Sequence, residues 1–521
     1  MKRKVLFKAI VFSLVLFGVL TITMTSCGAR TTTTAATTDD SSFSFLGQTW
    51  APYSPDQVDI WNELERRTGT RIDFIWAPLA EYDQRVNVVL ASGDLPDVIF
   101  NGNPATLIRE YAIIPLDDLL ASHGRNITRL FEGSDYLYLR QLIDSKIYHI
   151  PVMVDFPPAR SMLVRNDWIR QLGVDMPVTY VEWKNVWQLM RDTDLAGPGS
   201  RANQVPLMVC EGDGLLNYVN FFGIKMLGNA GGALFAYSPD ESRVIGLFDH
   251  PDFRMFLEEM RDLYARGILD REFVTRNVDY RILLDSGFAG STYYFAERAR
   301  VSTDVIRETF PDAELIGVPQ IQSYNGRQLV PAREKMGARG FTITIEAERR
   351  GVQNNIMRVL DYMFSDEGMV LLNYGIQGQH HDMVGGRPVI RQDISRGSFT
   401  EARRVGLIPS VVPFYFMEDA YLQLLLAGTD PAELPADSST RFFYDALFLN
   451  TPYFYDLMPI FTTEPYVQHQ ASLRPRLMEL YSICVTGQIT IEQFYAQYNT
   501  VLQAGWQQVI EAQNDTYQGM R

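Results

Sequence analysis

Polar and apolar residues beyond position 42 follow two different periods in turn. Phe43–Leu46 and Arg71–Trp76 have the alternation of strands, and the apolar spacing between them predicts a helix that ends at Gly69. Glu81–Ser92 has apolar residues at helical spacing, whereas Val98–Phe100 is a short apolar run typical of a strand covered on both faces. This order of strand, helix, strand, helix and strand predicts a mostly parallel sheet with helices on both faces.

The segment Leu90–Phe100, LASGDLPDVIF, joins the second of these helices to the third strand. Gly93 ends the helix because glycine adopts the left-handed cap conformation without a Cβ penalty. Pro96 cannot continue a helix and favours extended backbone at Leu95. The segment therefore predicts a helix end, a tight turn and a buried strand, in that order.

The second half of the chain carries similar signals. Thr179 followed by Glu182 forms a capping box, which predicts the start of a helix. His250–Asp252 begins a long amphipathic helix that Gly267 ends. Further strands are predicted at Val205–Val209, Ala289–Phe295, Leu315–Pro319 and Gly340–Ile345, and helices are predicted over Leu473–Tyr517.

The first 26 residues have the pattern of a secretory signal. Basic residues at Lys2–Lys4 precede an apolar stretch, Val11–Leu20, and small residues follow up to Cys27. An uncleaved membrane anchor is the alternative, but the apolar stretch is short for a bilayer span of about 20 residues. Residues 27–43 are polar and of low complexity, so we expect a flexible tether there.

Composition limits the partners. The chain has 521 residues, of which 46% are hydrophobic, and this suits two or three domains with large cores. Its formal net charge is −15, and removal of the first 26 residues, which contain four basic residues and no acidic one, leaves −19. A surface this acidic argues against nucleic acid and against anionic lipid as direct partners.

Besides Cys27, the chain contains Cys210 and Cys484, which lie far apart in the sequence. Two separate buried thiols are expected, because a chain of this size needs no covalent cross-link. A single disulfide between them is also compatible with the sequence.

Sequence motifs of common enzyme chemistry are absent. The chain has no Gly-x-x-x-x-Gly-Lys-Ser/Thr phosphate loop, no Gly-x-Ser-x-Gly nucleophile turn and no His-Glu-x-x-His zinc helix. His380 and His381 are adjacent and so point in different directions, which favours a polar loop over a metal site. The carboxylate pairs Asp117–Asp118 and Glu258–Glu259 are expected on solvated helix faces. We therefore predict no enzymatic activity, no cofactor and no metal.

Ala91–Val98, ASGDLPDV, closely resembles an element near the amino terminus of family 1 extracellular solute-binding proteins, the sugar-type receptors of ABC importers. Gln377 departs from the family, which usually has Glu there, so a role for that carboxylate is not expected. Further segments that resemble the same family, in the expected order, are Lys146–Pro151, Leu163–Tyr180, Phe364–Gly378 and Leu473–Tyr517.

Cys27 follows Thr25 and Ser26 in a setting similar to a bacterial lipobox, with Met24 where Leu is usual. The resemblance implies cleavage before Cys27 and lipidation of the new terminus, palmitate included. It implies a periplasmic, extracytoplasmic domain in the cell envelope of a bacterium, attached to the membrane by lipid alone.

The family resemblance implies a periplasmic-binding-protein-like α/β fold of type II, with two lobes, a hinge and a ligand cleft between the lobes. Lobe 1 is expected over 44–155 and 318–366, and lobe 2 over 156–317 and 367–521. Such a protein is a monomer that captures a carbohydrate, here an oligosaccharide, and delivers it to the permease subunits. A secreted carbohydrate-active enzyme and a ligand receptor for a sensor kinase are the alternatives.

Candidate ligand contacts follow from the rule that α/β proteins bind ligands beyond the carboxyl ends of parallel strands. Apolar sugar faces pack on aromatic rings, and sugar hydroxyls need convergent polar groups. The alternative for each candidate is core packing or a surface loop, and Trp61, Trp183 and Trp187 are expected in the core. The candidates are Trp50, Tyr53, Asn101, Asp155, Glu211, Asn217, Tyr218, Tyr293, Tyr294 and Arg339; the resemblance implies a stacking aromatic in the strand of Tyr293 and Tyr294.

Overall fold

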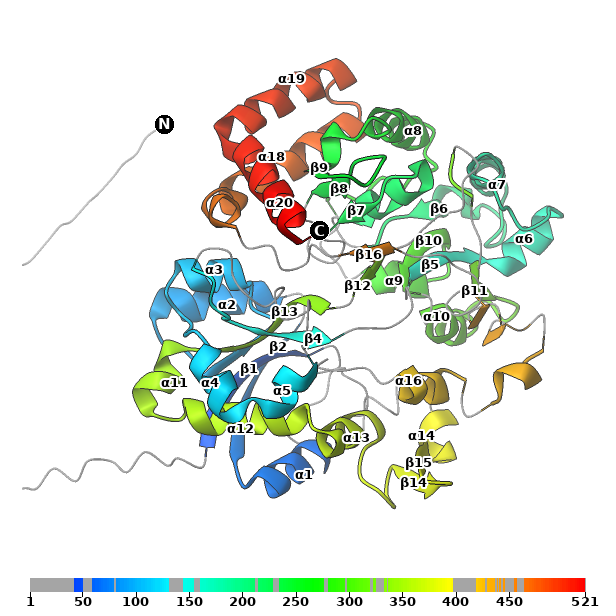
Figure 1. The fold of residues 1–521 in the computed structure, drawn as a ribbon. Helices are drawn as coiled ribbons and strands as arrows, with labels where there is room; N and C mark the ends of the chain where they lie inside the picture. Colours follow the sequence, from blue (N-terminus) through cyan, green and yellow to red (C-terminus); the bar gives the residue numbers. More distant parts are fainter. Residues whose placement is uncertain are drawn as a thin grey trace, which may run out of the picture. The chain divides into compact units, whose positions relative to one another are not determined.

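The computed structural model contains two main β-sheets, each covered by helices (Figure 1). The described residues belong to one unit, Asp40–Arg521. They are 42–49, 59–78, 81–130, 144–153, 160–210, 214–227, 234–275, 280–295, 298–318, 322–324, 332–334, 336–396, 418–426, 429–435, 438, 440–441, 444–445, 454–456 and 463–520.

The first sheet has the strand order β2-β1-β3-β13-β4. β1 pairs in parallel with β2 and β3, whereas β13 pairs antiparallel with both β3 and β4. Four strands therefore run in one direction and β13 runs against them, which confirms the predicted mostly parallel sheet. The bounds are β1 Ser42–Thr49, β2 Arg71–Pro78, β3 Val98–Phe100, β4 Ile150–Met153 and β13 Met336–Ile343.

Both faces of this sheet are covered, as the apolar run of β3 predicts. Phe45 and Phe100 belong to one core cluster, and their neighbours Leu46 and Ile99 belong to another. Successive strand residues point to opposite faces, so the two clusters lie on the two sides of the sheet. The first cluster includes α1 (Asp59–Thr68) and α12 (Gln353–Met363), and the second includes α2 (Tyr82–Ser92) and α3 (Pro104–Arg109).

The turn between α2 and β3 forms as predicted. Gly93 ends α2 at φ 72°, and its N–H donates to the Val89 carbonyl. Asp97, which has no exposed surface, accepts hydrogen bonds from the backbone N–H (2.7 Å) and the hydroxyl (2.8 Å) of Ser44, and it pairs with Arg350. This carboxylate therefore ties the start of β3 to β1 and to the segment after β13.

The second sheet has the strand order β11-β5-β10-β6. β10 and β6 are parallel, whereas β5 is antiparallel to β10 and to β11. Three strands again share one direction, and here β5 is the reversed one. The bounds are β5 Arg160–Arg165, β6 Val205–Met208, β10 Ala289–Phe295 and β11 Leu315–Val318.

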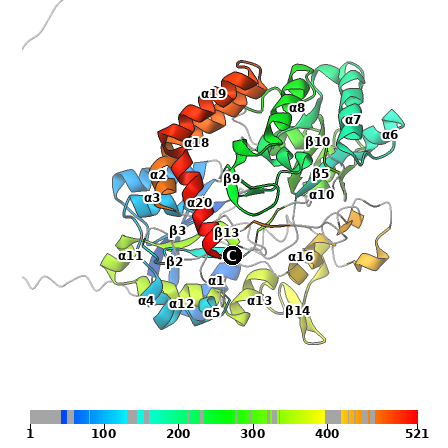
Figure 2. The same ribbon diagram turned by 45° about the horizontal axis from the view of Figure 1, so that its top comes forward.

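Helices from distant parts of the chain cover the second sheet. α7 (Tyr180–Asp192) begins with the predicted capping box of Thr179 and Glu182 and buries Trp183 and Trp187 completely. Of the carboxyl-terminal helices, α18 and α19 lie against α8, and α20 packs against α18 (Figure 2). Their bounds are α8 Phe253–Ala265, α18 Glu464–Val485, α19 Ile491–Val501 and α20 Gln507–Met520.

The core packing divides the chain differently from the predicted lobe boundaries after residue 366. Leu371 and Tyr374 of α13, with Ile390 and Leu424 further on, belong to the first core cluster, whereas the sequence placed 367–521 in lobe 2. α18, α19 and α20 pack in the core of the second sheet. Described residues on both sides of 397–417 thus supply side chains to the first core, because α13 directly follows α12 on that face. The other lobe limits stay a prediction.

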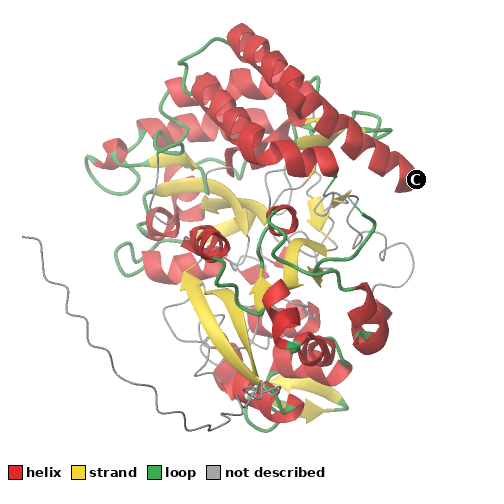
Figure 3. Cartoon of the chain, turned by 90° about the vertical axis from the view of Figure 1, so that its left-hand side faces the viewer, coloured by secondary structure: helices red, strands yellow, loops and turns green. Residues whose placement is uncertain are grey.

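Smaller elements connect these layers (Figure 3). Their bounds are α4 Asp117–His123, α5 Arg125–Leu130, α6 Asn166–Leu172, α9 Tyr280–Asp285, α10 Arg298–Ile306, α11 Ile345–Arg350, α13 Asp366–Tyr374, α14 Gln392–Arg396, α16 Glu418–Leu425, β7 Met226–Leu227, β8 Phe235–Tyr237, β9 Val244–Gly246, β12 Ala332–Glu334, β14 His381–Val384, β15 Arg387–Ile390 and β16 Phe454–Asp456.

Candidate functional site

Two of the connections between the sheets join the same pair of edges. β4 ends at Met153, beyond the carboxyl end of β3, and β5 begins at Arg160. Because β5 is reversed, Arg160 lies at the edge where β6, β10 and β11 have their carboxyl ends. Six residues separate the two strands, and a chain of that length spans at most about 25 Å.

The return crossing, from β11 to β13, also joins the carboxyl edges of the two sheets. β11 ends at Val318 on the carboxyl edge of the second sheet, and the reversed β13 begins at Met336 on the carboxyl edge of the first. Both carboxyl edges therefore meet the connections between the sheets. Ligands of open α/β sheets bind beyond carboxyl edges, so this is where the candidate site is placed.

Asn101 lies at the carboxyl end of β3 with an unusual backbone. Its φ is 59°, in the left-handed region that few residues other than glycine adopt, although asparagine tolerates it. Its N–H donates to the Gly340 carbonyl at 2.8 Å. The side chain is partly exposed. The backbone of the predicted candidate Asn101 is thus held at this edge.

Gly340 allows the strands of this edge to come together. A Cβ at this position would lie 1.9 Å from the Ile150 carbonyl oxygen, so only glycine fits between β13 and β4. Arg339 directly precedes Gly340 in β13. The structure therefore brings the backbones of two predicted candidates, Asn101 and Arg339, to the same point of the first sheet.

Tyr82 supports this edge and was not among the sequence candidates. It is buried, and its hydroxyl contacts the Phe100 carbonyl and, at 3.3 Å, the Leu46 carbonyl. One side chain thus joins β1 to the end of β3, next to Asn101 in the chain. Sequence spacing placed Tyr82 at the start of a helix but gave no signal that its hydroxyl reaches two strands.

On the second sheet, the Tyr218 hydroxyl joins two strands. It donates to the Met208 carbonyl at 2.9 Å and accepts from the Tyr293 N–H at 2.9 Å. Burial raises the pKa of Tyr218 well above its usual range, so the hydroxyl stays neutral. The ring packs on Phe221, with centroids 5.9 Å apart and planes at 19°. In this structure the polar and apolar parts of Tyr218 both contact protein groups.

The other candidates of this sheet are also buried. Tyr293 is 3% exposed and packs on Tyr218 and Phe221, and Tyr294 is 5% exposed with its ring edge-on to Phe295. Asn217 is 4% exposed. These three residues and Tyr218 lie at the predicted edge, and their roles as ligand contacts stay predictions.

Tyr324 is an exposed ring at the same edge, and the sequence analysis missed it. It follows β11 and has 43% of its surface exposed. Its ring stacks on Phe222, with centroids 5.9 Å apart and planes at 17°, and lies 5.8 Å from the Tyr180 ring. Its N–H donates to the Phe221 carbonyl at 2.6 Å. The rule that ligand contacts lie beyond the carboxyl ends of strands selected Trp50 and Asn101. Applied to the segment after β11, the same rule would have selected Tyr324.

Four candidates, Trp50, Tyr53, Asp155 and Glu211, lie outside the described residues, as does Cys27. Arg339 is described as part of β13 only by its backbone. Their predicted roles stay predictions.

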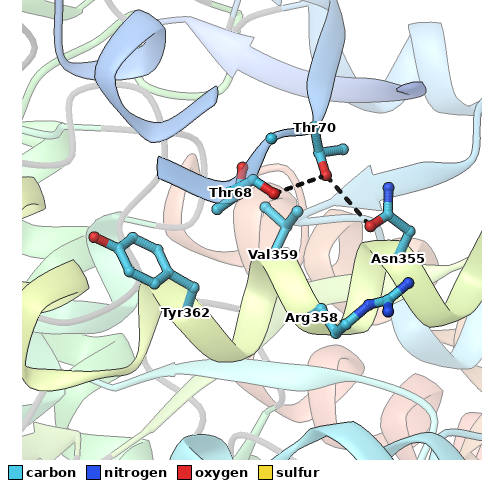
Figure 4. A pocket seen from close by; sticks show the side chains of 7 residues that line it. Thr68, Thr70, Asn355, Arg358, Val359 and Tyr362 are labelled. Carbon is cyan, nitrogen blue, oxygen red and sulfur yellow. Dashed lines mark hydrogen bonds between the residues drawn. The ribbon is translucent and has the colours of Figure 1, made fainter. Parts of the chain in front are cut away.

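A pocket of about 470 Å³ lies at the opposite edge of the first sheet (Figure 4). It is formed by the turn Thr68–Thr70, which leads from α1 into β2, and by the facing side of α12. The Thr70 hydroxyl contacts the Asn355 side-chain oxygen at 3.3 Å across it. Because β2 begins here, this pocket is at the amino edge and is separate from the candidate site.

The described residues offer no group of three or more His, Cys, Asp or Glu side chains that could hold a metal ion. His380 and His381 are buried, and their Nδ1 atoms contact the Ile376 N–H and the Tyr374 carbonyl. Cys210 and Cys484 are separate buried thiols, which confirms that interpretation over a disulfide. Within the described part of the chain, no helix combines the length and hydropathy needed to cross a bilayer.

Comparison with curated proteins finds relatives of low identity. The chain is 22% identical over 368 residues to the lipoprotein LipO of Bacillus subtilis strain 168, which covers 69% of this chain and 71% of LipO. It is 24% identical over 237 residues to FusA of Streptococcus pneumoniae, a fructooligosaccharide ABC transporter substrate-binding protein, with 43% of each chain covered. No family model matches the sequence.

Solved structures share the fold over nearly the whole chain. The alginate-binding protein AlgQ2, in a crystal structure without calcium ion, has a TM-score of 0.73 at 20% identity and covers 92% of this chain and 98% of its own. FusA in complex with kestose has a TM-score of 0.66 at 17% identity, covering 92% of this chain and 100% of its own, and an EF-hand mutant of FusA is also similar. The predicted two-lobe α/β fold and the resemblance to the substrate-binding proteins of carbohydrate ABC transporters are thereby confirmed.

Proposed function

We propose that this chain is an extracytoplasmic substrate-binding protein of an ABC importer, which binds an oligosaccharide between its two sheets and releases it to the permease. One observation carries the proposal: the crossings from β4 to β5 and from β11 to β13 both join the carboxyl edges of the two sheets, so these edges bound one shared site. The relatives support the same function, since FusA is named for fructooligosaccharide and AlgQ2 for alginate.

The proposed mechanism uses the crossings as a hinge. Ligand contacts on both edges are complete only when the edges approach, so ligand shifts the population toward a closed form that the permease recognises. No covalent bond is broken. Sugar binding and release therefore depend on rings and hydrogen-bonding groups at the two edges rather than on a nucleophile or an acid–base pair.

The first edge contributes polar groups in this proposal. The Asn101 amide can both donate to and accept from sugar hydroxyls, and Arg339 follows the same edge. Trp50, Tyr53 and Asp155 are further candidates from the segments that leave this edge. We propose Asn101 as the anchor because its position is fixed by a backbone hydrogen bond.

The second edge contributes an aromatic surface. Tyr324 exposes its ring, and the stack on Phe222 and Tyr180 fixes the plane of that ring before a ligand arrives. Tyr218, Tyr293, Tyr294 and Asn217 are buried, so we propose that they shape the wall behind the ligand unless the edge opens further. Tyr324 is the second-edge residue that this proposal places in direct contact with sugar.

A thermal-shift screen over mono- and oligosaccharides tests the function. A ligand that binds only the folded chain raises the melting temperature, by an amount that grows with ligand concentration. We expect oligosaccharides to give shifts, and calorimetry on the best one to give a saturable 1:1 isotherm. The same protein should release no sugar on long incubation. Hydrolysis that a single carboxylate substitution abolishes would establish the carbohydrate-active enzyme instead.

We further propose that Cys27 is the lipid-bearing first residue of the mature chain and that residues 27–41 tether a monomer to the membrane. The predicted tether, 27–43, ends earlier than expected, because Ser42 and Phe43 are buried in β1. A single acyl chain binds a membrane only weakly, so stable anchoring implies more than one. Cys27→Ala should move the protein from the membrane fraction to the soluble fraction of cells. Retention at the membrane as firm as that of the wild type would reject the lipoprotein assignment.

A further inference from the structure

The turn between α7 and β6 has part of the residue pattern of an EF-hand calcium loop. Such a loop takes oxygen ligands from positions 1, 3, 5, 7, 9 and 12, with glycine at position 6 and a bidentate Glu at position 12. With Asp192 at position 1, Asp194 falls at 3, Ala196 at 5, Gly197 at 6 and Asn203 at 12. Two of the solved neighbours are AlgQ2 without calcium ion and an EF-hand mutant of FusA, so whether this loop fits a cation is a specific question.

The side chains do not fit a calcium ion. Ala196 offers no ligand at position 5, and Asn203 cannot supply the two carboxylate oxygens of position 12. Both acidic residues are engaged elsewhere: the Asp192 carboxylate accepts from Gln188 at 2.6 Å, and the Asp194 carboxylate pairs with the Arg201 guanidinium at 3.2 Å.

Gln204 is the group that organises the loop. It is 6% exposed, and its side-chain oxygen accepts from the backbone N–H groups of Leu195 (2.7 Å) and Ala196 (2.9 Å) and from the Ser200 hydroxyl (2.5 Å). Its side-chain NH₂ donates to two carbonyls, those of Met190 at 3.0 Å and Thr193 at 2.9 Å. One amide thus makes five hydrogen bonds to groups spread over the whole turn.

The polarity of this arrangement is opposite to that of a cation site. Around a bound cation, oxygen atoms converge and their negative ends point inward. Here two backbone N–H groups and a hydroxyl converge on the Gln204 oxygen, so positive ends of dipoles point inward. Arg201 supplies the positive charge that Asp194 needs, and hydrogen bonds from the Arg201 and Gly199 backbones lower the pKa of Asp194.

We infer that the Gln204 amide, with the Arg201 guanidinium, replaces a structural cation, so that the 192–204 loop folds without calcium. The loop enters β6, whose carboxyl end lies at the second edge of the candidate site. Calcium would then have no influence on how this strand is positioned. The inference concerns the loop alone and does not depend on which solute the chain binds.

Hydrogen exchange on the full chain tests this inference, with calcium chloride or the chelator EGTA in the buffer. In the wild type, the amides of Leu195 and Ala196 should be equally protected in both buffers. Gln204→Ala should speed their exchange at least tenfold in either buffer, and calcium should not restore it. The matched control is Gln507→Ala, which removes an exposed glutamine with one side-chain hydrogen bond and should leave the loop unchanged.

Two results would overturn the inference. The first is loss of protection at Leu195 and Ala196 of the wild type in EGTA, which would show that a cation holds the loop. The second is full protection in Gln204→Ala, which would show that the amide does not. If Gln204→Ala does not fold, the protection of Leu195 and Ala196 in the wild type, with calcium or with EGTA, still tests the inference. A calcium-dependent melting temperature with constant protection of this loop supports the inference, because the calcium then acts at another place.

Discussion

The carboxyl edges of the two sheets are built in opposite ways. At the first sheet the backbone defines the edge: Asn101 adopts a positive φ, and Gly340 lets β13 approach β4. At the second sheet side chains define it: the Tyr218 hydroxyl joins β6 to β10, and the neighbouring rings pack on each other. The polar side chain of Asn101 is therefore partly exposed at one edge, whereas the other edge buries the aromatic residues that were predicted there.

This contrast shows what a strand-end position can and cannot decide. It places a residue at the edge of a sheet, but the direction of the side chain depends on neighbours from other elements. At the first edge the Asn101 N–H donates to the Gly340 carbonyl, and the Asn101 side chain is partly exposed. At the second edge Tyr218 finds two backbone partners in the core, which is a better environment for its hydroxyl than an unpaired position.

The largest effect is expected for Gly340→Ala. The added methyl would collide with the Ile150 carbonyl and push β13 away from β4, and such overpacking against backbone costs about 3 kcal/mol or more. Urea unfolding measures the loss. Gly69→Ala is the control, since Gly69 has φ 67° but open space around it, and should cost about 1 kcal/mol. An equal loss of unfolding free energy in both variants would contradict the close approach of β13 to β4.

The two halves can also be compared by the loss of stability at acid pH, because each contains a buried histidine. Burial lowers the pKa of His149, just before β4, to about 4, below its ordinary value near 6.5. The unfolded chain then binds this proton at a higher pH than the folded chain does. The contribution of neutral His149 to the free energy of unfolding is therefore complete above pH 6.5. It declines as the pH falls toward 4, by up to about 3 kcal/mol.

His149→Gln should flatten the decline in stability between pH 6.5 and 4, as measured by urea unfolding at several pH values. His250→Gln is the matched variant in the second half, where burial also lowers the pKa of His250 but Asp252 opposes the shift. Its flattening should be smaller. The reverse ranking would show that the first half does not hold the more strongly buried histidine.

Tyr218→Phe tests whether the second edge depends on one hydroxyl. The change removes both hydrogen bonds of the Tyr218 hydroxyl, while the Met208 carbonyl still accepts from the Thr292 hydroxyl at 3.0 Å. Each lost buried hydrogen bond costs about 1 kcal/mol. We expect unfolding to become easier by about 2 kcal/mol, with sugar affinity changed less than twofold. A tenfold loss of affinity at unchanged stability would instead place this hydroxyl on the ligand.

The sequence predicted the fold better than the site. Gly93 and the capping box of Thr179 each act through local backbone physics, so the end of α2 and the start of α7 appear where expected, and the strand predicted at Ala289–Phe295 forms as well. Site residues depend on contacts between distant segments. Tyr82 reaches β1 and β3, and Gln204 reaches back to Met190, and neither contact leaves a periodic signal in the sequence.

The smallest expected effect is also the most specific. Tyr324→Ala removes an exposed ring whose plane Phe222 and Tyr180 already fix. A ring covered by a sugar contributes on the order of 1.5–3 kcal/mol when fully buried, and about 1.4 kcal/mol is one decade of affinity. Calorimetry with the best oligosaccharide of the screen should therefore show about tenfold weaker binding, with little loss of stability because the ring is 43% exposed without ligand.

The control for this change is Tyr111→Ala, which removes another exposed tyrosine, 83% exposed and located after α3 at the opposite edge of the first sheet. Sugar affinity should stay within twofold of the wild type. If Tyr324→Ala behaves like Tyr111→Ala while Tyr218→Ala or Tyr293→Ala abolishes binding, then the second edge opens to expose its buried rings when sugar binds. In that case the contrast between the two edges describes the ligand-free chain alone, and Tyr324 is not a contact.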